Sequence, residues 1–152
     1  MITVSNLFKS FGQTPVLCGA TLTLAKGTST VVIGKSGSGK SVLMKSILGL
    51  VKPDSGTILQ DGAPLDQTRF LDDFGMLFQG AALFDSLPVW QNVAFRLLRR
   101  MPKAKARAIA LEKLGRVGLE ADVADRLPAM LSGGMQKRAG LARAIATNPS
   151  VL

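Results

Sequence analysis

The chain has no histidine, no tyrosine and a single cysteine, Cys18, among its 152 residues. Without histidine, it cannot use a histidine general base or a histidine metal ligand. One cysteine cannot form an internal disulfide, which favours a reducing compartment, and Cys18 is expected to be a small buried apolar residue. The seven phenylalanines and one tryptophan lie mostly among apolar neighbours, which is poor material for stacking nucleic-acid bases.

Long hydrophobic runs are also missing. The longest apolar stretches, such as residues 47–51, fall far short of the roughly 18–20 residues that a membrane-spanning helix needs. The first residues lack the basic region of a secretory signal peptide. With 152 residues, 47% of them hydrophobic, we expect one globular domain with a sizeable core. Because both a membrane span and a signal peptide are missing, we expect it in the cytosol.

The net charge of +9 would suit nucleic acid or an anionic membrane as a partner. The basic residues are scattered, however, apart from one concentration between residues 96 and 107. A solvated helix surface explains that concentration better than a functional basic patch. We therefore expect no nucleic-acid partner.

One stretch has the residues and the spacing of a phosphate-binding loop. It fits the pattern G-x-x-x-x-G-K-[S/T] and consists of Gly34, Lys35, Ser36, Gly37, Ser38, Gly39, Lys40 and Ser41. The glycines allow a tight turn whose N–H groups face phosphate oxygens, Lys40 would reach the β- and γ-phosphates, and the Ser41 hydroxyl would hold Mg²⁺. Residues 31–33 are expected to form a buried strand before the loop, and a helix should follow it, so a merely flexible Gly/Ser loop is disfavoured.

The remaining pattern predicts strands followed by helices. Strands are expected at residues 2–4, 16–24, 57–60 and 74–78, with turns at Asn6 and Gly12 and a hairpin turn at Asp61-Gly62. The first helix should run from about residue 39 to residue 49. Later helices are expected from Val89, with Val93 and Leu97 on its apolar face, from about residue 102 to residue 115 or 118, and over residues 135–147.

A second segment could also bind an anion. Ser132 is a good N-cap for the last helix, and Gly133 and Gly134 leave its first N–H groups free. Alone, this segment indicates only a capped helix; together with the phosphate loop it indicates a nucleotide site.

At this point the sequence resembles the ATP-binding cassette (ABC) family of transporter ATPases. Residues 34–41 are similar to its Walker A loop, and residues 131–138 to its signature motif, where Met135 replaces the usual glutamine. Gln79 is similar to the Q-loop glutamine, and Phe11 to the aromatic residue that stacks on adenine. The resemblance implies an α/β fold: a P-loop NTPase core of the ABC type with an N-terminal antiparallel β-subdomain and a helical subdomain.

Residues 78–95 are similar to a narrower branch, the ATPases of Mla-type lipid transporters that work with Mce-domain proteins. Packing of the helical subdomain alone would also explain Leu83, Phe84 and Trp90. The resemblance implies that this segment docks a transmembrane permease, with the subunit peripheral on the cytoplasmic face of the bacterial inner membrane and phospholipid as the transported substrate.

The family resemblance further implies a shared ATP site. Two chains would pair head to tail, with ATP and Mg²⁺ between residues 34–41 of one chain and Ser132, Gly133 and Gly134 of the other. Lys40 and Gln79 would be the catalytic residues. Ser41 and Gln79 would contact Mg²⁺.

The resemblance assigns residues 1–79 to the β-subdomain and P-loop core, 80–131 to the helical subdomain, and 132–152 to the signature helix and the start of the Walker B strand. The Walker B carboxylates and the switch histidine have no counterpart. The chain is thus expected to be an N-terminal part of a cassette, truncated before Walker B, that binds ATP without hydrolysing it efficiently. The alternatives are a soluble ABC ATPase acting on nucleic acid or the ribosome, and an inactive nucleotide-binding fragment.

Overall fold

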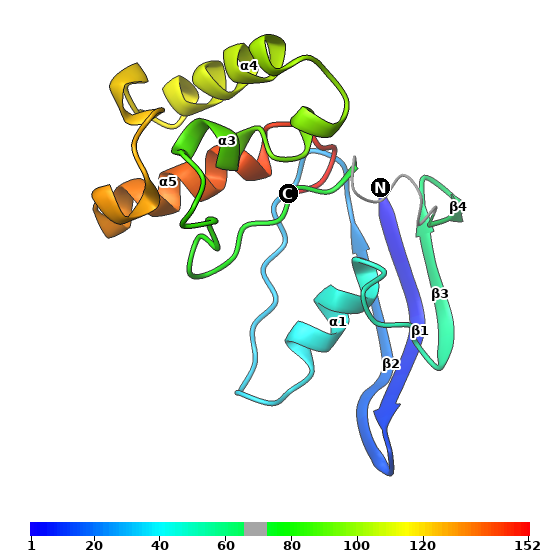
Figure 1. The fold of residues 1–152 in the computed structure, drawn as a ribbon. Helices are drawn as coiled ribbons and strands as arrows, with labels where there is room; N and C mark the ends of the chain where they lie inside the picture. The colour runs from blue at the N-terminus through cyan, green and yellow to red at the C-terminus, as the bar shows by residue number, and fades with distance from the viewer. Residues whose placement is uncertain (66–72) are drawn as a thin grey trace. The chain divides into compact units, whose positions relative to one another are not determined.

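The computed structural model describes residues 1–65 and 73–152, which belong to two units (Figure 1). The first unit is Met1–Phe70 and the second is Leu71–Leu152. Each unit has its own secondary structure and its own buried side chains, and each is described by itself.

The first unit is built on an antiparallel sheet with the strand order β2-β1-β3-β4 (Figure 1). The strands are β1 (Ile2–Phe11), β2 (Thr14–Leu24), β3 (Ser55–Gln60) and β4 (Ala63–Pro64). Strand β1 lies between its neighbours, pairing Ile2 with Leu24 of β2 and with Gln60 of β3. Alternate apolar side chains at its start, Ile2 and Val4, are buried, as the period of two predicted.

Two expectations for these strands were wrong. Asn6 is no turn between strands; it lies inside β1 with φ 48°, where the register shifts between Val4 and Leu7. A β-bulge explains this, because one extra residue can be accommodated without ending the strand. Cys18 is exposed, since Leu17 beside it is buried and successive side chains of a strand point to opposite faces.

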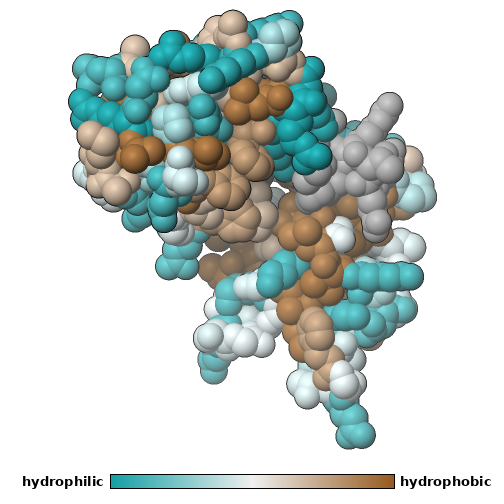
Figure 2. Space-filling model, in the orientation of Figure 1, coloured by the Kyte–Doolittle hydropathy of each residue, from teal (hydrophilic) through white to brown (hydrophobic). Residues whose placement is uncertain are grey.

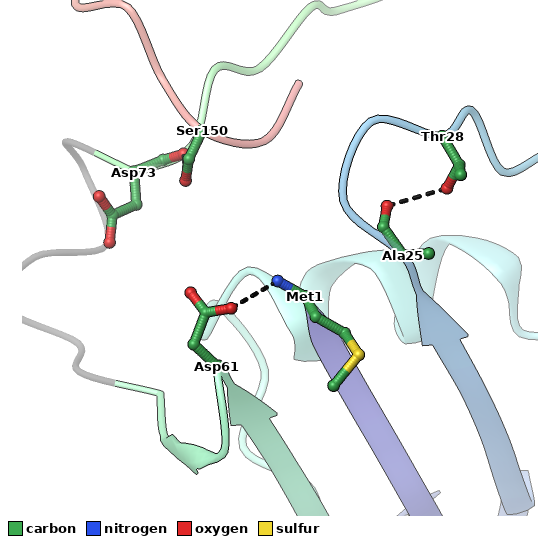
Figure 3. A network of polar contacts seen from close by, with 6 residues as sticks. All are labelled: Met1, Ala25, Thr28, Asp61, Asp73 and Ser150. Atoms are coloured by element: carbon green, nitrogen blue, oxygen red, sulfur yellow. Dashed lines mark hydrogen bonds and ion pairs between the residues drawn. The ribbon is translucent and has the colours of Figure 1, made fainter.

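The hairpin between β3 and β4 confirms its sequence signal. Asp61 and Gly62 both have positive φ values, 50° and 82°, as a two-residue hairpin turn of type I′ requires. The Met1 ammonium donates to Asp61 Oδ1 over 2.7 Å, and this hydrogen bond lowers the pKa of the Asp61 carboxyl (Figure 3). Because both groups are exposed, the ion pair adds little stability.

Helix α1 (Lys40–Ile47) follows the phosphate loop and buries Leu43 and Ile47. Gly49 has φ 67°, and the amides of Gly49 and Leu50 donate to the carbonyls of Ser46 and Lys45. The helix therefore ends near the predicted glycine, two residues before it, and the left-handed conformation of Gly49 allows the last carbonyls to be bonded.

The predicted buried strand at residues 31–33 is absent. The segment has no regular secondary structure, and Val31 and Ile33 are 79% and 88% exposed. A strand needs hydrogen-bonding neighbours, and among the described residues no strand pairs with this segment. Apolar residues are visible on the surface of both units in Figure 2.

Over its described residues, 73–152, the second unit packs helices α3 (Val89–Val93), α4 (Lys103–Arg116) and α5 (Gly133–Ala144) around an apolar core (Figure 1). The same residues form the short 3₁₀ turns η1 (Leu97–Arg99), η2 (Ala121–Val123) and η3 (Pro128–Met130). Val93, Ala110, Leu114 and Ala139 are almost completely buried in this core. No helix among the described residues is long and apolar enough to cross a membrane.

Two predicted elements of this unit are shorter than expected. The strand at residues 74–78 is reduced to an isolated parallel bridge between Phe74 and Val151, so Gln79 lies in a turn and not at the end of a strand. The helix from Val89 ends at Val93, although Val93 and Leu97 are both buried as its periodicity predicted. The bridge between Phe74 and Val151 does not extend into a strand, because no neighbouring residue pairs on either side of it within the described chain.

Candidate functional site

The phosphate loop, residues 34–41, has glycines at two crowded positions, and at one of them the backbone requires glycine. Gly39 caps helix α1 in the left-handed region with φ 87°, and an added Cβ there would lie 2.9 Å from the Val16 carbonyl oxygen. An added Cβ at Gly34 would lie 2.7 Å from Ser38 Oγ. The clash at Gly39 is with main chain and its φ is positive, so this position of the motif has a direct steric reason, whereas the Ser38 hydroxyl beside Gly34 can rotate away.

Lys40 is folded back into the loop. Its Nζ donates to the carbonyl oxygens of Gly34 and Lys35 over 2.8 and 2.7 Å and lies 3.5 Å from Ser38 Oγ. The ammonium group is thereby held by the loop itself, in a position where phosphate oxygens could replace the carbonyls as acceptors. Lys40 is also the first residue of α1, whose positive end adds to its charge.

The first turn of α1 fits an anion and a magnesium ion. It carries no acidic residue, and Ser41 is exposed on it. A hollow of about 210 Å³ lies along the loop between Val16 and Val42. The steric room, the free helix N-terminus and the ammonium group therefore match the phosphate chain of a nucleotide, with the Ser41 hydroxyl able to hold Mg²⁺.

Phe11 lies in the same unit, at the end of β1. Its ring is 52% exposed, and Lys9 Nζ is 5.5 Å from the ring centroid. Phe11 pairs with Thr14 across the β1–β2 hairpin. An exposed ring at the end of a hairpin can stack on a base. The assignment of Phe11 to adenine stays a prediction.

The Ser132 segment opens helix α5 in the second unit. Ser132 Oγ accepts from the Met135 amide over 3.3 Å, which confirms the predicted N-cap. Gly133 and Gly134 are exposed, with nothing within 4 Å of an added Cβ, and the first turn has no acidic residue. Met135 contributes its amide to the cap, so its side chain does not decide the geometry.

Gln79 also belongs to the second unit, where it is exposed in a turn. The phosphate loop and Phe11 thus lie in one unit, and Gln79 and the Ser132 segment in the other. Within the second unit, Arg143 of α5 donates to the carbonyl oxygens of Ala81 and Ala82, which follow Gln79.

Sequence reasoning missed two residues that shape this unit, Arg143 and Asn92. Asn92 is fully buried, and its amide side chain forms hydrogen bonds with the main chain of Phe84, Leu87 and Pro88. An asparagine between apolar helix positions was the only available signal for it. Arg143 gave no signal, because its partners lie about 60 residues earlier in the chain.

Comparison with known proteins agrees with this geometry. The family model described as "ABC transporter" matches residues 17–152, which is most of the chain. The probable ribonucleotide transport ATP-binding protein mkl of Mycobacterium bovis is 42% identical over 99% of this chain and 44% of its own length. The sulfate/thiosulfate import ATP-binding protein CysA of Thermosynechococcus vestitus is also 42% identical, over 99% of this chain and 45% of its own.

A solved structure has the same fold. The ATP-binding cassette MJ0796, in a dimeric post-hydrolysis state bound to ADP and Pi, superimposes with a TM-score of 0.83 at 32% identity. The match covers 98% of this chain and 71% of that one. This chain spans less than half the length of the two curated relatives. From its phosphate loop, its capped signature helix and these matches, the chain belongs to the ABC transporter family of ATP-binding proteins.

Proposed function

We propose that the chain is the nucleotide-binding part of the ATP-binding subunit of an ABC transporter. The observation that carries the proposal is the phosphate loop, in which Lys40 Nζ is held by the Gly34 and Lys35 carbonyls at the start of α1. Family membership supports ATP as the ligand, because a relative of the same fold binds ADP and Pi. ATP hydrolysis by the intact protein is part of this proposal.

Each residue of the proposed nucleotide site would have a separate role. The loop N–H groups and Lys40 would bind and orient the phosphates, Phe11 would stack on the base, and Gln79 would contact Mg²⁺ or the attacking water. Bound Mg²⁺ would neutralise charge on the β- and γ-phosphates. Ser132, Gly133 and Gly134 would complete the site of a second copy from its opposite side.

Transport of phospholipid is the narrower proposal. It rests on the resemblance of residues 78–95 to Mla-type ATPases, whereas the relatives named above carry the names of ribonucleotide and sulfate/thiosulfate transport. Co-expression with candidate permease and Mce-domain proteins tests it: ATPase activity of the purified complex should rise with added phospholipid. A rise with ribonucleotide or sulfate instead would contradict the lipid proposal.

We also propose that residues 78–95 dock the permease at the cytoplasmic face of the membrane. The rings of Phe84 and Phe95 are in contact, with centroids 4.6 Å apart and planes tilted by 34°, yet both residues remain more than 40% exposed. Phe78 is similarly exposed. Exposed aromatic side chains on a well-packed unit are typical of an interaction surface.

Head-to-tail pairing leads to a testable expectation for the chain in solution. Saturating MgATPγS should convert monomers to dimers, because each nucleotide would be bound by residues 34–41 of one copy and residues 132–134 of the other. Light scattering after size-exclusion chromatography measures this, and Ser132→Arg, which places a bulky cation at the second copy's contact, should keep the chain monomeric. An unchanged monomer in saturating nucleotide would contradict the shared site.

A further inference from the structure

The turn after Gln79 has an unfavourable backbone conformation. Ala81 and Ala82 have φ values of 58° and 49°, in the left-handed region that alanine rarely adopts. Within the turn, the Ala81 amide donates to the Phe78 carbonyl and the Ala82 amide to the Gly80 carbonyl. Such hydrogen bonds occur in many turns and do not by themselves require this conformation. Contacts from outside the turn are needed to keep two consecutive alanines in this state.

Arg143 supplies those contacts from helix α5. Its Nη2 and Nη1 each donate over 2.7 Å, to the carbonyl oxygens of Ala81 and Ala82 respectively. A planar guanidinium can bind two adjacent acceptors at once, which the ammonium group of a lysine cannot reproduce. Among the described residues no carboxylate pairs with Arg143, so its hydrogen bonds go to these two main-chain oxygens.

A second contact joins the same two elements. Gly140 lies one turn before Arg143 on α5, and an added Cβ there would lie 3.1 Å from Ala81 Cβ. Ala81 itself is only 2% exposed. The turn therefore packs directly against the backbone of α5, and Arg143 binds it through two further hydrogen bonds.

These contacts connect the Gln79 turn to the helix that also carries the Ser132 segment. The same helix begins at Gly133, directly after the Ser132 cap. One rigid element thus carries the Ser132 segment at its start and holds the Gln79 turn near its end. At the other end of the Gln79 segment, Arg96 Nη1 donates to the Phe74 carbonyl oxygen over 3.0 Å.

We propose that Arg143 is a positioning residue that couples the Gln79 turn to helix α5, so that nucleotide contact at the Ser132 segment also changes the mobility of the Gln79 turn. This coupling rests on the proposed function, because it concerns regulation of the same nucleotide site. Arg143 touches no nucleotide in this scheme. It transmits the position of the helix to the turn.

Hydrogen exchange measured by mass spectrometry tests the coupling in the whole chain. Without nucleotide, Arg143→Lys should speed exchange of the amides at residues 80–82 by about tenfold or more, because the paired hydrogen bonds are lost. Arg138→Lys is the matched control: Arg138 lies on the same helix and donates to a carbonyl oxygen, that of Gly118, away from the turn. It should leave residues 80–82 unchanged.

Saturating MgATPγS provides the readout that a purely structural role would not alter. In the wild-type chain it should slow exchange at both residues 79–82 and residues 132–136. In Arg143→Lys the slowing at residues 80–82 should be lost, whereas Gln79, which would contact Mg²⁺ itself, and residues 132–136 should keep theirs. Equal protection of both segments in the variant would overturn the coupling.

A second variant guards against misfolding. Gly140→Ala pushes on Ala81 while leaving the guanidinium in place, and it should also speed exchange at residues 80–82, with the fluorescence of the buried Trp90 unchanged. Exchange within twofold of wild type in both variants would overturn the proposal. Failure of the wild-type chain to bind MgATPγS would instead contradict the proposed function. Exchange measured without nucleotide would still test whether Arg143 holds the turn.

Discussion

Replacing Lys40 by alanine is expected to weaken MgATP binding by about 10- to 100-fold. Lys40 Nζ lies at the centre of the phosphate loop, bonded to the Gly34 and Lys35 carbonyls, where it can exchange these acceptors for phosphate oxygens. A hydrogen bond to a charged group contributes about 1.5–3 kcal/mol, and each 1.4 kcal/mol corresponds to about tenfold in affinity. Isothermal titration calorimetry of wild-type chain and variant measures the ratio directly.

Lys45→Ala is the matched control for this experiment. Lys45 lies in the last turn of the same helix and is exposed, so its removal changes the net charge by the same amount without touching the loop. Its affinity for MgATP should stay within about twofold of wild type, since exposed charges are screened. Equal losses in both variants would show that overall charge, and not the geometry of the loop, governs binding.

Replacing Asn92 by alanine is expected to destabilise the second unit by about 3 kcal/mol or more. The Asn92 side chain is fully buried, accepts from the Phe84 amide over 2.6 Å and donates to the carbonyl oxygens of Phe84 and Leu87. Alanine would leave the Phe84 amide and the Leu87 carbonyl without this partner, while the Phe84 carbonyl still accepts from the Leu87 amide. Each buried unsatisfied group costs about 1–3 kcal/mol. Urea unfolding followed by the fluorescence of the only tryptophan, Trp90, measures the change.

The neighbouring substitution Gln91→Ala controls for helix propensity and for truncation on the same helix. Gln91 is half-buried, and its loss should cost less than about 1 kcal/mol. If Asn92→Ala were no more destabilising than Gln91→Ala, the buried amide would not be what fixes residues 84–88. The exposed rings of Phe84 and Phe95, which the proposed docking surface uses, depend on that segment.

Features with a local physical cause could be predicted from the sequence. The hairpin at Asp61-Gly62 follows from backbone conformations that these two residues tolerate, and the cap at Ser132 needs a partner only three residues away. Gly39 of the phosphate loop likewise follows from its left-handed conformation and its close approach to the main chain of β2. These elements need little knowledge of the rest of the fold.

Features that depend on distant partners could not be predicted. Residues 31–33 have the β-branched composition of a buried strand, yet a strand forms only where a neighbour pairs with it. Cys18 was expected inside because of its residue type, whereas its place in β2 beside the buried Leu17 decided its exposure. Arg143 contacts Ala82 and Ala81, which lie 61 and 62 positions earlier in the chain, and periodicity does not reveal a contact at such a separation.

The assignment of nucleotide contacts to Phe11, Gln79 and the Ser132 segment stays a prediction. The structure describes an exposed ring, an exposed turn and a capped helix, and each of them suits its proposed role. The phosphate loop rests on the firmest geometry, because the steric requirement at Gly39 and the bonds of Lys40 are independent observations of the same site.

Calorimetric titration of the 152-residue chain with MgATP determines whether residues 34–41 bind a nucleotide. We expect saturable binding with one nucleotide per chain and a dissociation constant below about 1 mM, a range typical of enzymes for their substrates. Removing Mg²⁺ with a chelator should weaken the binding, because the Ser41 hydroxyl would lose the ion it holds. Absence of saturable heat up to millimolar MgATP, in a chain shown by circular dichroism to be folded, would contradict the claim that residues 34–41 form a nucleotide site.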